Sequence, residues 1–203
     1  MHSSLKTAGL GLVLAAASIA TPSAAQQYSF DLSQLDPAAV ASVGGDLLRR
    51  APDAAIDDLF QAVRTSAQSS EEAAILCALF EPGADRSAQA IQRTAERLGP
   101  ASRERFANAF VGIALAGLQG QPQSYDAAAA QQALKATAVK AGFLHDGFGA
   151  GLNASGNDPA SREARCRSFR QLVGVLGNEP LPTRTLATRW LLDQGLTLAV
   201  AAR

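Results

Sequence analysis

Apolar residues recur at helical spacing along most of the chain after about residue 36. In one clear example they stand at i, i+3, i+4 and i+7, at Ile56, Leu59, Phe60 and Val63, the pattern of a helix with one buried face. Asp-Pro pairs at 36–37 and 158–159 place an acceptor at the N-cap and proline at N1, whereas Gly-Pro at 99–100 ends a helix. This pattern predicts helices that begin near residues 37, 52, 70, 85, 102, 125, 159 and 183.

No strand alternation of useful length and no repeat of fixed period interrupt this pattern. We therefore expect an all-α fold, a single compact bundle of seven to eight helices over residues 36–203. Residues 109–118 read AFVGIALAGL and contain no polar side chain, so this segment has no face suited to water. It is expected to be the central helix of the bundle.

The first 25 residues have the pattern of a secretory signal peptide. Lys6 precedes an apolar stretch of 13 residues from Ala8 to Ala20, and small residues follow up to Ala25. A membrane span needs roughly 20 apolar residues, so a cleaved signal is favoured over a retained anchor. We expect cleavage after Ala25, an extended lead-in over 26–35, and a periplasmic or secreted protein with no integral membrane segment in the mature chain.

Two cysteines, Cys77 and Cys166, remain in the mature chain. In an oxidising compartment such a pair predicts a disulfide, which by chain entropy stabilises the fold by about 4 to 5 kcal/mol. The stripe of Cys166 and neighbouring apolar residues faces inward, whereas Cys77 is expected on the flank of its helix. A metal site is disfavoured because the mature chain has one histidine, His145.

Charge gives little reason to expect nucleic acid as a partner. Without residues 1–25 the chain has 17 basic and 18 acidic side chains, and arginine exceeds lysine 15 to 3 in the whole chain, which suggests a bacterial source. Residues 26–85 hold 10 acidic and 3 basic side chains, and residues 159–203 hold 3 and 7. We favour internal pairing of these two regions over docking of a charged partner.

The segment 142–157 has the fewest helix signals and is predicted to be a flexible glycine-rich loop. Its partner-binding candidates are Phe143, His145, Phe148 and Asn153, although packing of the phenylalanines onto the domain is the stronger interpretation. His145 beside Asp146 could form half of a general-base pair, but no motif places a nucleophile near them. The glycine run lacks the preceding strand of a nucleotide-binding turn.

No catalytic, metal or cofactor motif emerges, so we expect a non-enzymatic protein without cofactors. The leading hypothesis is an exported helical protein that binds another periplasmic or secreted protein, such as an inhibitor or immunity-type protein that neutralises a toxin or enzyme. The alternative is a carrier of a small apolar ligand or lipid held among the helices. A hydrolase that uses His145 and Asp146 is the weaker third hypothesis.

Overall fold

The computed structural model describes residues 37–201, and the side chains of 42–87 and 89–198. Within this range the chain is all-helical, which confirms the predicted class, and the expected signal sequence and lead-in lie outside the described residues. The elements are α1 (Pro37–Arg50), α2 (Asp53–Gln68), α3 (Ser70–Cys77), the 3₁₀ turn η2 (Ala78–Phe80), α4 (Ala88–Arg97), α5 (Pro100–Gln119), α6 (Ala127–Leu144), α7 (Phe148–Leu152), α8 (Pro159–Leu176) and α9 (Leu181–Ala201).

Side-chain caps fix where several helices begin. Asp126 accepts hydrogen bonds from the first N–H groups of α6, and Asp158 accepts one from Ser161 at the start of α8, with Pro159 at N1 as predicted. Ser69 caps α3 and Ser87 caps α4 in the same way. These short polar residues satisfy N–H groups that have no partner within the helix.

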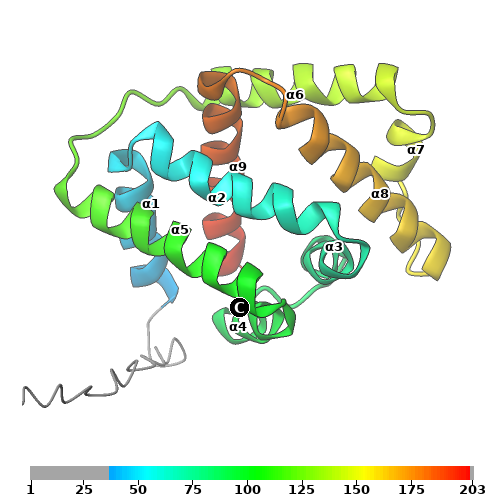
Figure 1. Ribbon diagram of the computed structural model, residues 1–203, viewed down its shortest axis with the longest axis horizontal. Helices are drawn as coiled ribbons and strands as arrows, with labels where there is room; N and C mark the ends of the chain where they lie inside the picture. Colours follow the sequence, from blue (N-terminus) through cyan, green and yellow to red (C-terminus); the bar gives the residue numbers. More distant parts are fainter. Residues whose placement is uncertain (1–36, 202–203) are drawn as a thin grey trace, which may run out of the picture. The chain divides into compact units, whose positions relative to one another are not determined.

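The core is built around α2. Its residues Ile56, Leu59 and Phe60 are 0–4% exposed, and α2 packs against both α5 and α9 (Figure 1). The expectation that residues 109–118 form the central helix is wrong. Only one stripe of α5 is fully buried, at Ser102, Ala109, Ile113 and Gly117, with Phe106 partly buried beside it, and the opposite side of the helix is exposed.

The predicted number of helices is too low, because the structure has nine α-helices between residues 37 and 201. The additional helix, α7, lies inside the segment predicted to be a loop, and α6 continues to Leu144. Gly147 adopts a left-handed conformation with φ 77° and turns the chain from α6 into α7. Phe148 then packs with Ala141 and Val175 and holds α7 in place.

The disulfide between Cys77 and Cys166 is present and joins the end of α3 to α8. The expected burial of the two cysteines is reversed. Cys77 is 6% exposed and Cys166 is half-buried, because the short helix α3 is covered on more than one side. The rings of Phe80 and Phe169, each three residues beyond a cysteine of the disulfide, lie with centroids 5.1 Å apart and are tilted by 32°.

Three ion pairs connect the acidic first part of the chain with the basic last part. They are Glu81–Arg165, Asp57–Arg184 and Asp53–Arg189. In the first two pairs all four side chains are at most 20% exposed. The charge asymmetry of the sequence therefore serves internal pairing, as the sequence analysis favoured.

Candidate protein-binding surface

Helix α5 presents large apolar side chains to solvent. Three of them lie on its outer side and are more than half exposed, and they are referred to here as the α5 apolar face: Val111 at 55%, Leu115 at 55% and Leu118 at 73%. Phe110 is also 55% exposed but lies about 100° around the helix from Val111. Single exposed apolar residues are ordinary on protein surfaces, whereas several on consecutive turns of one helix make that helix a candidate interaction site.

Small residues on the inner stripe of α5 explain why its large residues lie outside. Gly117 lies so close to α1 that an added Cβ would be 2.7 Å from the backbone oxygen of Leu47. Ala109 and Ile113 pack into a core cluster with residues of α1 and α2. The close approach leaves room for only one stripe of α5 beneath the surface, so Val111, Leu115 and Leu118 face outward.

A groove of about 280 Å³ runs between α2 and α5. This α2–α5 groove is lined by Asp58, Gln61, Ala62, Thr65, Arg105, Asn108 and Ala109. Ala62 and Ala109 are 2% and 5% exposed and form its floor, and the other five residues supply polar walls. Asn108, Val111 and Leu115 follow one another at i, i+3 and i+7, so the groove borders the α5 apolar face.

Hydrogen bonds hold the basic wall of the groove in position. The Arg105 guanidinium donates to the Ser102 hydroxyl over 2.5 Å, and this hydroxyl donates to Glu72 over 2.6 Å. The backbone N–H of Gly99 donates to the other Glu72 oxygen over 3.2 Å. Burial raises the pKa of Glu72, but the bonds from Ser102 and Gly99 and the charge of Arg105 outweigh it and lower the pKa below its ordinary value.

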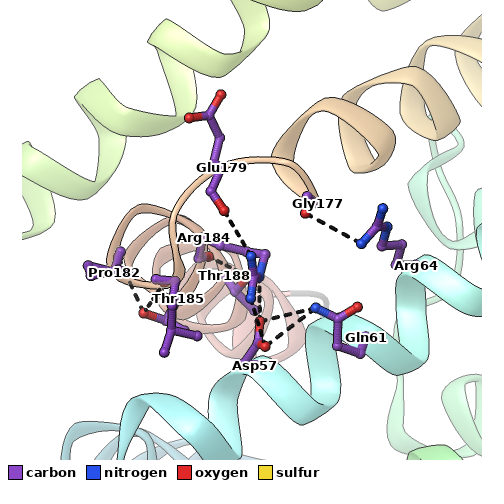
Figure 2. Close-up of polar contacts among 10 residues, drawn as sticks. Asp57, Gln61, Arg64, Gly177, Glu179, Pro182, Arg184, Thr185 and Thr188 are labelled. Atoms are coloured by element: carbon purple, nitrogen blue, oxygen red, sulfur yellow. Dashed lines mark hydrogen bonds and ion pairs between the residues drawn. The ribbon is translucent and has the colours of Figure 1, made fainter.

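The opposite wall is fixed because α2 is tied to α9. The Arg184 guanidinium donates to both Asp57 oxygens, over 2.5 and 2.9 Å, and to the Glu179 carbonyl over 2.8 Å (Figure 2). The bonds from Arg184 lower the pKa of Asp57 despite burial. Asp57 thus serves the fold, whereas its neighbour Asp58 is exposed on the wall of the groove.

The four residues predicted to form a partner-binding loop do not share one surface. Phe143 is 88% exposed at the end of α6, whereas Phe148 is 3% exposed in a core cluster. His145 is half-buried and its backbone N–H caps α6 at Ala141. The amide of Asn153 donates to the Gly149 carbonyl over 2.8 Å and so closes α7.

His145 and Asp146 are the catalytic candidates of the sequence. No hydrogen bond or ion pair in the described range involves the side chains of His145 and Asp146, and no group of three metal-binding side chains occurs there. None of the helices in residues 37–201 is both long enough and apolar enough to cross a membrane.

No family model, curated protein or solved structure matches this chain. The α5 apolar face and the groove beside it are therefore interpreted from their own geometry.

Proposed function

We propose that this chain is an exported protein that acts by binding another protein through the α5 apolar face. The observation that carries the proposal is the exposure of Val111, Leu115 and Leu118 on one face of a helix beside a groove with polar walls. An apolar centre with a polar border is the usual composition of a protein–protein interface.

Export is supported by the N-terminal sequence and the disulfide. The signal-like pattern of residues 1–25 directs a chain to the periplasm or the exterior, and the bond between Cys77 and Cys166 is of a kind that persists in oxidising compartments. The partner is accordingly a periplasmic or secreted protein, and a toxin or enzyme neutralised by an inhibitor of this kind falls in that class.

The energetics favour a specific contact over a loose one. Fully burying a leucine or valine side chain is worth about 1.5 to 3 kcal/mol relative to leaving it exposed. Leu115 and Leu118 already lie on a rigid helix, so little conformational entropy is lost when a partner covers them. Truncating a central residue of such a contact typically costs about 2 kcal/mol or more in binding.

The carrier hypothesis loses its main support. It depended on an apolar central helix that could line an internal cavity, and the large apolar residues of α5 face solvent instead. We therefore propose protein binding alone.

A comparative pull-down from the compartment of origin tests the proposal. The bait proteins are the wild type, Leu115→Asp and the matched control Phe143→Asp, which places the same charge at another exposed apolar position on α6. We expect a stoichiometric partner with the wild type and the control, and at least tenfold lower recovery with Leu115→Asp. Circular dichroism verifies that both variants remain folded.

Two results contradict the proposal. Equal recovery by all three baits would exclude the α5 apolar face, and selective loss with Phe143→Asp would move the site to the end of α6.

A further inference from the structure

Two strips of side chains with matching spacing pass through polar residues of the α2–α5 groove, at Asp58, Gln61 and Thr65 on α2 and at Asn108 on α5. Both repeat with alternating steps of four and three residues, and nearly all their members are exposed. The strip on α2 is Ala54, Asp58, Gln61, Thr65 and Gln68, and the strip on α5 is Glu104, Asn108, Val111, Leu115 and Leu118. This spacing is that of a coiled-coil seam, to which a further helix adds by fitting its side chains between the two rows.

The two helices run antiparallel along this seam. Gly120, at the end of α5, lies against the backbone of Arg50, just before α2 begins. Thr65, near the end of α2, lines the groove together with Arg105 near the start of α5. From Glu104 to Leu118 the seam extends about 21 Å at 1.5 Å per residue, which accommodates four turns of an added helix.

A helix suits this surface better than an extended segment. An added strand needs a free row of backbone N–H and C=O groups, and those of α2 and α5 are used within the helices. The seam offers side chains only. Its occupant must therefore satisfy its own backbone hydrogen bonds, as a helix does.

The charge available along the seam is acidic. Asp58 and Glu104 are exposed, and neither forms an ion pair within the described residues. Arg105 is the basic residue of the groove, but its guanidinium donates to Ser102 and its positive charge is near the carboxylate of Glu72. Asp58 lines the groove, and Glu104 lies one helical turn before the lining residue Asn108, so the two carboxylates favour positive charge on the partner.

We infer that the partner segment is a basic amphipathic helix that lies in the α2–α5 groove. Its apolar side chains cover Val111, Leu115 and Leu118, and two lysine or arginine side chains reach Asp58 and Glu104. Because Gly120 lies opposite Arg50 in the antiparallel pair, Asp58 lies beside residue 112 of α5. Residue 112 is about 12 Å along the helix axis from Glu104. The two basic residues of the partner helix are therefore seven or eight positions apart. This inference rests on the proposed function and specifies the partner's chemistry.

A second copy of this chain fits the seam less well. The exposed strip of α6 contains Val139 and Phe143, but of its two lysines Lys140 is paired with Glu179 over 2.8 Å. Lys135 alone cannot match two carboxylates. The charges therefore favour a helix of another protein over a second copy of this chain.

Synthetic peptides test this chemistry with the purified full chain. The first is a fluorescein-labelled 16-residue helical peptide with leucines at heptad positions and two lysines eight positions apart on the flank. The second is identical except that glutamates replace the two lysines. We expect the lysine peptide to bind the wild type at least tenfold more tightly in fluorescence anisotropy. The double variant Asp58→Lys/Glu104→Lys should abolish or reverse this preference, and the control Glu163→Lys on α8 should retain it.

The outcomes separate this inference from the proposed function. Equal binding of both peptides, with both lost in Leu115→Asp, would leave the α5 apolar face as the binding site and overturn the basic helix. Binding of neither peptide would overturn the basic helix, and the pull-down with Leu115→Asp would then decide the proposed function on its own. A dimer in sedimentation velocity that Leu115→Asp and Phe143→Asp each dissociate would make a second copy the occupant and overturn the inference.

Discussion

Arg165 of α8 forms an ion pair with Glu81, the residue that follows η2, directly beside the disulfide at Cys166. The same guanidinium donates to the carbonyl oxygens of Ala154 over 2.8 Å and Gly156 over 2.7 Å. One half-buried side chain therefore connects α8 both with Glu81, 84 residues away in the sequence, and with the segment that precedes α8. It also fixes the connection between α7 and α8, which has no helix of its own.

Arg165→Ala is expected to lower the free energy of unfolding by about 3 kcal/mol, since it leaves a partly buried carboxylate and two carbonyl groups without their donor. Hydrogen exchange followed by mass spectrometry should show faster exchange in residues 153–158 than in the wild type. The exposed Arg162 on the same helix provides the control, and Arg162→Ala should leave both quantities nearly unchanged. Similar exchange rates in all three proteins would contradict the role given to Arg165.

The disulfide closes a sequence separation of 89 residues. The double variant Cys77→Ser/Cys166→Ser is expected to lose about 4 kcal/mol of stability, since the unfolded chain regains the entropy that the cross-link removed. Urea denaturation of the variant and of the wild type with and without reductant measures this loss. Reduced wild type and the variant should unfold at similar urea concentrations, and an unchanged midpoint in both would refute the prediction.

The local pattern of the sequence could predict the helices because their ends are set locally. Asp158 and Pro159 start α8 as expected, and the apolar stripe of α2 is the buried one. The short helix α7 was missed because its stability comes from Phe148 in a tertiary cluster rather than from helix-forming residues. Its two glycines, Gly149 and Gly151, are poor helix formers on their own.

The candidate binding surface could not be predicted because it depends on how helices pair. The composition of residues 109–118 shows only that the segment has no polar side chain. It does not indicate how many neighbouring helices cover the segment. Gly117 lets α1 come close on one side, and the large residues of α5 are left on the other. The sequence also gives no sign that the strip from Glu104 to Leu118 lies beside α2.

The ion pair between Asp57 and Arg184 makes stability depend on pH in a defined direction. The bonds from Arg184 lower the pKa of Asp57 in the folded state, so its contribution is complete above the unfolded value of about 3.9 and is lost as the pH falls through the folded value. Asp57→Asn should destabilise the protein by about 2 kcal/mol at pH 7. Urea denaturation should show this difference shrinking below about pH 4. A difference that stays constant from pH 7 to pH 3 would exclude the proposed origin.

Arg189 is 4% exposed and holds the junction between α1 and α2. Its guanidinium donates to the carbonyl of Leu48, to that of Ala51 over 2.8 Å, and to Asp53 over 2.9 Å. Arg189→Met keeps much of the side-chain volume but leaves these acceptors unpaired, so we expect a loss of about 3 to 5 kcal/mol. Thermal unfolding measures it, and a melting temperature within about 2 °C of the wild type would contradict the assignment.

Two glycines of α5 test the close packing that turns its large residues outward. At Gly117 an added Cβ would lie 2.7 Å from the Leu47 backbone oxygen, whereas at Gly112 no atom lies within 4 Å. Gly117→Ala should therefore destabilise the protein by about 1 to 3 kcal/mol because α1 must shift. Gly112→Ala should stabilise it by about 0.5 to 1 kcal/mol through helix propensity alone. Chemical denaturation of the two variants compares the same substitution in the same helix, and equal effects would mean that α1 does not approach α5 as closely as the structure places it.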